Sequence, residues 1–131
     1  MDDKWKYVDH WHHRAARSVF EPGYNGKGSY IESLGLALDK NINVHDKKWA
    51  KILKADAHVG EGGVHPSKYN DKLKEVVKRG IGKKGLFVNN IITEKELARI
   101  IKNAEKETSG VADIIKKGKS PLDGNHQTWK K

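Results

Sequence analysis

Histidines spaced for metal and acid–base chemistry stand out in this chain. His12 and His13 are adjacent in the segment Asp9–His13, and His58 and His65 follow far downstream. Imidazole binds divalent metals and acts as a base near neutral pH. On an extended segment, adjacent side chains point to opposite sides of the backbone. One histidine of the pair could then hold a metal ion while its neighbour faces a substrate.

The two downstream histidines flank the glycine-rich loop 60–63. Glycine lets the backbone turn tightly, so the two rings could approach one centre. Simpler interpretations also exist. His58 could stabilise a helix C-terminus, and His65 could cap the start of the next helix. His12 and His13 could be polar positions on a partly exposed strand.

The composition fits one basic domain, assigned to residues 1–131. The chain has 26 Lys and Arg against 17 Asp and Glu, a formal net charge of +9, which favours polyanionic partners. Cysteine is absent, so disulfides and cysteine-ligated zinc are excluded. We expect no membrane partner, because no long apolar run occurs. No apolar signal-peptide core follows Met1.

The first half predicts short elements around the histidine pair. Residues 4–14 carry alternating aromatics and predict a strand or extended segment. Residues 21–28 predict a loop. Ser29 and Glu32 have capping-box spacing, which predicts a helix from Tyr30 that buries Ile31, Leu34 and Leu38. Residues 41–44 are interpreted as a short strand or a turn. A helix is expected from about Asp46, burying Trp49, Ile52, Leu53 and Ala57.

The second half predicts mainly helices. One begins near Pro66 and ends near Gly80, with an inward face of Tyr69, Leu73, Val76 and Val77. Residues 82–85 predict a basic turn and residues 86–88 a strand. A capping box at Thr93 and Glu96 opens a helix with Leu97, Ile100, Ile101 and Ala104 inward. A short helix over 111–117 and a polar tail over 118–131 follow. The expected class is α+β, mainly helical.

The order of these motifs resembles the Ala-His-His and Trp-His-His subgroups of the HNH/endonuclease VII, or His-Me finger, nuclease superfamily. The matching segments cover about residues 9–80 and are Trp11-His12-His13, Leu34 to Asp39, Asn41 to Val44, His58, and His65 to Asn70. The resemblance implies a ββα-metal core with additional helices, extended at the C-terminus by the helical segment of about residues 86–117. It implies a metal-dependent endonuclease that hydrolyses phosphodiester bonds.

The resemblance also implies roles for individual residues. His12 corresponds to the first metal ligand and His13 to the general base. Asn43, with Asn41 as the alternative, corresponds to the residue that orients the base. His58, His65 or both close the metal site, and Tyr69 and Asn70 support it. The ion is one divalent metal, with Mg²⁺ expected first and Mn²⁺, Ni²⁺ or Zn²⁺ as alternatives.

Basic residues near these motifs are candidates for phosphate contacts. The segment from Arg14 to Arg17 replaces the family's usual continuation, and Lys68 and Lys72 begin a basic run that continues to Lys84. The run could also be a solvated helix face. The resemblance further implies a toxin module of a secreted bacterial effector, as in polymorphic toxin C-terminal domains. Such a module acts in the target-cell cytoplasm, cuts DNA rather than RNA by expectation, and is neutralised by an acidic immunity protein.

Two other functions fit parts of the sequence. A non-catalytic basic DNA- or RNA-binding domain would explain the charge and the helices, but not the histidine order. A zinc-stabilised interaction domain could use His10, His12, His58 and His65, although all-histidine structural sites are uncommon. Metal-dependent cleavage of nucleic acid separates the nuclease from both alternatives. Unfolding by a chelator would identify the zinc-stabilised domain.

Overall fold

A short antiparallel strand pair carries the histidine pair. The computed structural model describes residues 4, 8–59, 66–81 and 87–120, and in it β1 (Asp9–His13) pairs with β3 (Ala50–Lys54). His12 lies opposite Lys51 and His13 lies opposite Ala50. Opposed residues share a face of an antiparallel pair, so the two histidines project from opposite faces, as the sequence predicted.

The remaining elements make the fold α+β and mainly helical, as expected. Between β1 and β3 lie α1 (Arg17–Phe20), the 3-10 turn η2 (Tyr24–Gly26), α2 (Tyr30–Ser33), β2 (Ala37–Leu38) and η3 (Lys47–Trp49). After β3 come α3 (Ala55–Val59), α4 (Pro66–Ile81), η4 (Val88–Asn90), β4 (Ile91–Ile92), α5 (Glu94–Glu107) and α6 (Val111–Lys117). β2 pairs with β4 in parallel.

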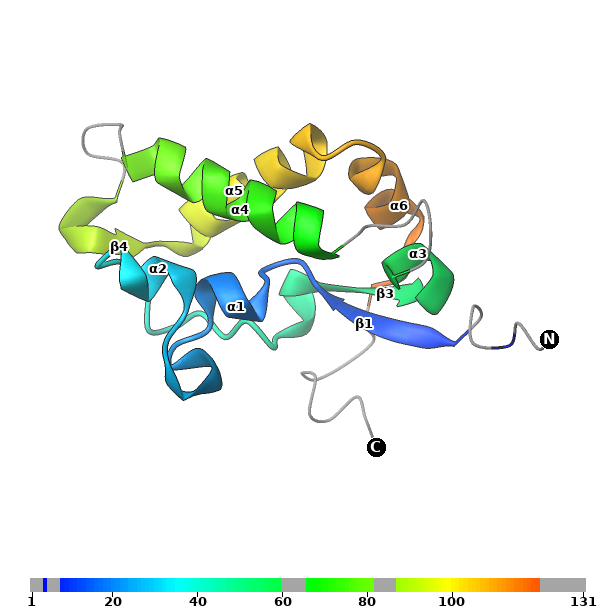
Figure 1. Cartoon of the computed structure of the whole chain (residues 1–131), viewed down its shortest axis with the longest axis horizontal. Helices are drawn as coiled ribbons and strands as arrows, with labels where there is room; N and C mark the ends of the chain where they lie inside the picture. The colour runs from blue at the N-terminus through cyan, green and yellow to red at the C-terminus, as the bar shows by residue number, and fades with distance from the viewer. Residues whose placement is uncertain (1–3, 5–7, 60–65, 82–86, 121–131) are drawn as a thin grey trace.

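The two long helices lie side by side and cover the short elements. Figure 1 shows α4 and α5 along one side of the molecule, with β1, α1 and α2 along the other. One hydrophobic cluster joins them, and it includes Phe20, Ile31, Trp49, Tyr69, Leu73, Val77, Leu97, Ile101 and Ile115. The C-terminal helices therefore contribute to the same core as the histidine-bearing segment. Within the described ranges, no helix is long and apolar enough to cross a membrane.

Local sequence signals were accurate where a helix is amphipathic and capped. Thr93 and Glu96 form the expected capping box before α5, and the four predicted inward residues of α5 are buried. α4 starts at Pro66, and its four predicted inward residues are buried as well. The short helix over 111–117 is also present as α6.

The helix predicted from Asp46 is wrong. Residues 47–49 form a 3-10 turn, and residues 50–54 form β3 before the short α3 begins. Trp49 and Leu53 are buried as predicted, whereas Ile52 and Ala57 are only half-buried. Leu53 lies in the strand that pairs with β1, and Trp49 lies in the 3-10 turn before it. The ladder continues at both ends, where Arg14 N donates to Trp49 O at 2.8 Å and Ala55 N donates to Val8 O at 2.7 Å. Long-range pairing has overridden a weak local helical pattern.

Two smaller predictions also need correction, and a third is decided between its alternatives. The capping box at Ser29 is present, but α2 ends at Ser33 because Gly35 adopts a left-handed φ of 78°. Leu34 is consequently exposed, and Leu38 belongs to β2. Residues 41–44 form a turn, which is one of the two alternatives predicted for them. In the predicted strand 86–88, residue 86 lies outside the described residues, and Val88 begins a 3-10 turn.

A half-buried ion pair ties the end of β1 to α5. Arg14 Nε donates to Glu105 Oε2 at 2.7 Å, and Arg14 Nη2 donates to Glu105 Oε1 at 2.9 Å. The Glu105 side chain is 8% exposed, whereas the Arg14 side chain is 26% exposed. This bidentate geometry is the strong form of an Arg–carboxylate pair. The pair holds the backbone that follows the two histidines.

We expect Glu105→Ala to destabilise the fold by about 2 kcal/mol or more, because it leaves a partly buried guanidinium without its partner. Glu94→Ala is the matched control, since Glu94 pairs with Lys48 on the surface and both side chains are more than half exposed. The free energy of unfolding of that variant should fall by at most about 1 kcal/mol. Urea unfolding of both variants measures the difference, and equal losses would contradict a special role for the Arg14–Glu105 pair.

Candidate functional site

A polar cavity of about 180 Å³ lies beside the histidine pair. β1, α1, α3 and α4 all contribute to its walls, which are lined by Trp11, His12, His13, Ala16, Arg17, Ser18, Tyr24, His58 and Asn70. The cavity therefore brings together three of the histidines singled out in the sequence. It also collects Arg17 and Asn70, two residues predicted from the same motifs.

His12 is a buried histidine with an unused nitrogen. Its side chain is 3% exposed, and its Nε2 atom has no hydrogen-bond partner within the described part of the chain. The ring centroid lies 5.2 Å from that of His58 and 5.5 Å from that of Tyr69. A buried polar atom without a partner is costly, so it is usually explained by a functional contact.

Burial keeps both of these imidazoles uncharged at neutral pH. Desolvation lowers the pKa of His12 to about 3, and the nearby His58, His13 and Arg14 add to the effect. Desolvation likewise lowers the pKa of His58 to about 4, with a smaller contribution from His10. Only the neutral form of histidine offers a nitrogen lone pair to a metal ion.

His58 is oriented by a further histidine. Its Nδ1 lies 3.1 Å from Nδ1 of His10, and the two rings meet edge to face at a centroid distance of 5.3 Å. Because Nδ1 of His58 is engaged in this contact, Nε2 is the ring nitrogen through which His58 can bind a metal ion. A hydrogen bond to the second ring nitrogen is how proteins commonly orient a ligating histidine.

His13 lies in a different environment from His12. Its Nε2 is 3.2 Å from Nδ1 of His45, and Nε2 of His45 is 2.5 Å from Oε1 of Glu21. The three side chains come from β1, from the turn before η3 and from the end of α1. They form a connected chain that runs from a carboxylate, through one imidazole, to a second imidazole at the cavity.

The charge of Glu21 fixes the direction of the hydrogen bonds in this chain. Burial raises the pKa of Glu21, but hydrogen bonds from Arg17 and His45 outweigh it and hold that pKa below its usual value. An ionised carboxylate only accepts, so Nε2 of His45 donates. In the tautomer of His45 that carries its proton on Nε2 alone, Nδ1 accepts, and Nε2 of His13 donates to it. This tautomer places the basic lone pair of neutral His13 on Nδ1.

The sequence did not predict Glu21 or His45 as site residues. His45 follows Asn43, the residue expected to orient the base, and the described bond of the Asn43 side chain is to His45. Asn43 Oδ1 accepts a hydrogen bond from the backbone N of His45 at 2.9 Å. Asn43 therefore holds the turn that carries His45, whose ring contacts His13. The alternative, Asn41, is exposed, and its backbone N donates to Asp39.

The two supporting residues, Tyr69 and Asn70, begin the second turn of α4. Tyr69 is fully buried, and its hydroxyl donates to the carbonyl of Arg14 at 2.5 Å. Burial raises the pKa of Tyr69 well above its usual value, so the phenol stays a hydrogen-bond donor. Asn70 lines the cavity directly. Tyr69 thus fixes the backbone after the histidine pair, while Asn70 is placed to meet a ligand.

The predicted phosphate-binding residues separate into two groups. Arg17 lines the cavity and is exposed, although it also pairs with Glu21 at 3.1 Å. Arg14 instead pairs with Glu105, and Lys72 pairs with Glu75 at 3.2 Å. Neither Lys68 nor Lys72 is among the residues that line the cavity. The geometry therefore favours Arg17 over the other three for a phosphate contact at this site.

The histidines expected to bind a metal ion are only partly among the described residues. Among them, no group of three or more His, Asp, Glu or Cys side chains is arranged to hold an ion. The rings of His12 and His58 lie 5.2 Å apart, centroid to centroid, and His65 lies outside the described residues. Two imidazoles that share a tetrahedral ion at about 2.1 Å have their centroids roughly 5 Å apart. The His12–His58 distance fits that requirement.

Acid should destabilise the metal-free protein through His12 and His58. Because their folded-state pKa values are lowered from 6.5, the unfolded chain binds protons that the folded chain does not. We expect this stability to be complete above pH 6.5 and to fall as the pH drops towards 4, by up to about 1.4 kcal/mol per pH unit for each proton. Urea unfolding in EDTA at pH 7 and pH 5 measures the loss. If the free energy of unfolding of His12→Leu changes with pH as that of the wild type does, the loss of stability in acid does not come from His12.

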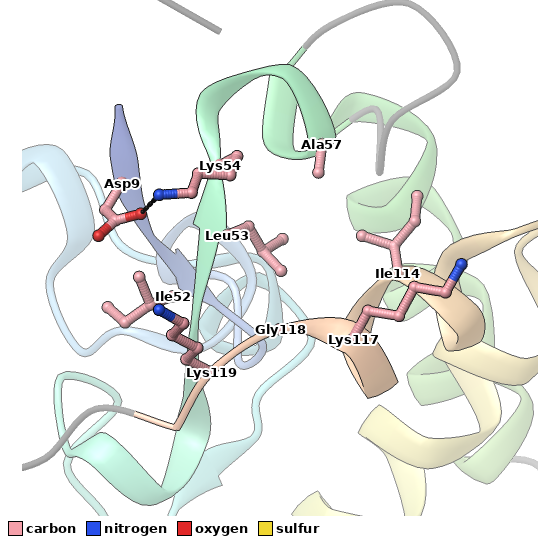
Figure 2. A pocket seen from close by; sticks show the side chains of 9 residues that line it. All are labelled: Asp9, Ile52, Leu53, Lys54, Ala57, Ile114, Lys117, Gly118 and Lys119. Carbon is pink, nitrogen blue, oxygen red and sulfur yellow. Dashed lines mark hydrogen bonds and ion pairs between the residues drawn. The ribbon is translucent and has the colours of Figure 1, made fainter. Parts of the chain in front are cut away.

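A second hollow, of about 240 Å³, lies between β3 and α6. Figure 2 shows Leu53 and Ile114 on either side of it and the Lys54–Asp9 ion pair at its rim. Its walls are mostly apolar, and none of the histidines in the described segments lines it. Nothing in the structure shows what covers this hollow. The residues that could do acid–base or metal chemistry line the other cavity, so the chemistry is assigned there.

Comparisons with known proteins identify no relative. No protein-family model, no curated protein sequence and no solved structure matches this chain.

Proposed function

We propose that this protein is a metal-dependent endonuclease that hydrolyses phosphodiester bonds of nucleic acid. The observation that carries the proposal is the contrast between two adjacent histidines at one cavity. His12 is buried and neutral with an unused nitrogen beside His58, whereas His13 is hydrogen-bonded through His45 to Glu21. The first environment suits a metal ligand, and the second suits a base.

His12 and His58 would hold the ion, with His65 as the expected third protein ligand. When bound, the ion would stabilise negative charge on the phosphate and the leaving oxygen. Imidazole nitrogens suit Zn²⁺, Ni²⁺ or Mn²⁺ better than Mg²⁺, which prefers oxygen ligands. We therefore propose one divalent ion and regard Zn²⁺, Ni²⁺ and Mn²⁺ as candidates equal to Mg²⁺.

His13 would serve as the general base through Nδ1. It accepts a proton from a water molecule, whose oxygen bonds to phosphorus while the bond from phosphorus to the leaving sugar oxygen breaks. The leaving oxygen takes up a proton from solvent. The positive charge that forms on His13 is stabilised through His45 by Glu21, as a carboxylate stabilises an imidazolium in hydrolases that use such chains. Arg17, at the cavity wall, is placed to contact the phosphate.

The arrangement of elements supports a ββα-metal core as part of this proposal. β1 and β3 form an antiparallel pair, and the helix α3 follows β3 directly. The base and the first ligand come from the first strand, and the next ligand, His58, comes from the helix. This is the order of elements that the resemblance to His-Me finger nucleases implies.

The biological setting is proposed from the same resemblance. We propose a toxin module of a secreted bacterial effector that acts in the target-cell cytoplasm, with DNA as the first substrate to test. Its formal net charge of +9 suits an acidic immunity protein, because charge complementarity speeds association. Co-expression with a small acidic protein encoded beside it should suppress its toxicity.

Incubation of the protein with plasmid DNA and with total RNA tests the proposed activity. Each substrate is combined with Mg²⁺, Mn²⁺, Ni²⁺, Zn²⁺ or EDTA, and the products are separated on gels. We expect cleavage with at least one metal and none in EDTA. Intact substrate with every metal, together with salt-sensitive binding, would replace the nuclease with the non-catalytic binding domain.

The chain from Glu21 to His13 makes a separate prediction. Glu21→Gln keeps an acceptor for His45 but removes the negative charge, so the cleavage rate should fall on the order of tenfold to a hundredfold. Metal affinity should stay unchanged, because Glu21 lies on the side of the base. Glu94→Gln removes a carboxylate of a surface ion pair and is the control. If both variants cleave at the wild-type rate, Glu21 has no part in the reaction.

A further inference from the structure

Another hollow adjoins the histidine-lined cavity. This hollow has a volume of about 340 Å³, and it shares Ser18 and Tyr24 with the cavity. From there it extends over Lys27 and Tyr30 to Lys74 on α4. The two hollows together form one groove, named here the tyrosine groove, which leads to His12 and His13.

The walls of the tyrosine groove pair aromatic rings with cations. The guanidinium of Arg17 lies over the ring of Tyr24, and the ammonium of Lys74 lies over the ring of Tyr30, each at 5.5 Å from the ring centroid. Both tyrosines are half-buried, so their rings are fixed by packing and remain partly accessible. Along the groove, a flat apolar surface and a positive charge therefore occur together twice.

The groove has an excess of positive charge. Among the described residues, no acidic side chain lines either hollow. Lys27 and Lys74 form no ion pair in the described part of the chain, in contrast to Lys72 on the neighbouring turn of α4, which pairs with Glu75. Along the described part of α4, Lys68, Lys74 and Lys78 form no ion pair, and of these three Lys74 lines the groove.

We infer that the tyrosine groove binds a single-stranded, unstacked segment of nucleic acid and leads it to the histidines, an inference that rests on the proposed nuclease function. Tyrosine faces stack on exposed bases of any sequence, and lysines between them neutralise phosphates. In a duplex the bases are stacked on one another and paired, so they do not offer their faces to such rings. The groove therefore prefers single strands, loops or frayed ends.

Equilibrium binding in EDTA tests the inference without cleavage. Fluorescence anisotropy of labelled 12-nucleotide single strands, both DNA and RNA, is compared with that of a duplex of equal length. We expect at least roughly tenfold tighter binding of a single strand. Tyr24→Leu should weaken single-strand binding on the order of tenfold to a hundredfold, whereas Tyr24→Phe, which keeps the ring, should bind like the wild type.

A charge-matched pair of variants completes the experiment. Lys74→Gln should weaken binding and reduce the slope of log affinity against log salt by about one. Lys102→Gln on α5 removes the same charge from an exposed position outside the groove and should leave the slope almost unchanged. Circular dichroism confirms that each variant is folded.

Two outcomes would overturn the inference. One is equal affinity for the single strand and the duplex, and the other is wild-type binding by Tyr24→Leu. Failure of the nuclease proposal would look different, because the wild type would then bind single strands through Tyr24 but cleave nothing with any metal. Cleavage that is retained in a Tyr24→Leu variant of unchanged affinity would refute the groove and leave the nuclease intact.

Discussion

His13→Ala should remove most of the cleavage activity while the protein still binds its metal ion. Loss of a general base typically costs on the order of a hundredfold to ten-thousandfold in rate. The substitution should spare the metal, because His13 lies on the opposite face of β1 from His12 and is engaged with His45. Cleavage rate and metal affinity of the folded variant are the measurements.

Substitutions of His45, which contacts His13, and of Asn43, which holds the turn of His45, show whether His13 acts as the base. His45→Ala should lower the rate less than His13→Ala does, and Asn43→Ala less again, because each acts one step further from the water molecule. This order of effects is expected only if the proton moves to His13. Wild-type cleavage by His13→Ala with metal supplied would exclude the mechanism.

The neighbouring substitution, His12→Leu, should abolish metal binding and cleavage together. Leucine fills a similar space but offers no lone pair to the ion. The metal-free variant should nevertheless be more stable than the wild type by about 1 kcal/mol or more, because the substitution removes a buried Nε2 atom that has no hydrogen-bond partner among the described residues. A residue that reduces stability but is needed for activity is the expected signature of a functional site.

Titration calorimetry and urea unfolding in EDTA check both parts of this prediction. His58→Leu should also weaken metal binding, since its ring lies beside that of His12. If His12→Leu binds metal as the wild type does, the ion is held elsewhere. If instead it loses stability in EDTA, the His12 ring is a packing residue of the core.

The sequence predicted the long helices well because their signals are local. α4 and α5 have a regular apolar face, and the start of each is marked by a proline or a capping box. Residues 46–57 carry an equally regular apolar pattern, yet five of them form a strand. Their conformation depends on pairing with β1 about forty residues earlier, which a local window does not contain.

The site could be predicted only where one segment determines the geometry. An extended Asp9–His13 places His12 and His13 on opposite faces by backbone periodicity alone. By contrast, the contact of His45 with Glu21 joins residues from two separate turns. No motif marked either residue. The one indication in the sequence was Asn43, because an asparagine side chain often accepts a hydrogen bond from the backbone two residues further on, which here is His45. The engagement of Arg14 by Glu105 likewise depends on how α5 packs.

Anomalous diffraction from crystals grown with Mn²⁺ or Zn²⁺ locates a bound ion relative to His12, His58 and His13. We expect one anomalous peak at about 2.0–2.3 Å from Nε2 of His12, with a nitrogen of His58 as a second ligand and His13 outside the coordination sphere. A contradictory result would be a crystal with ordered His12 and no peak beside it, or an ion held by His13.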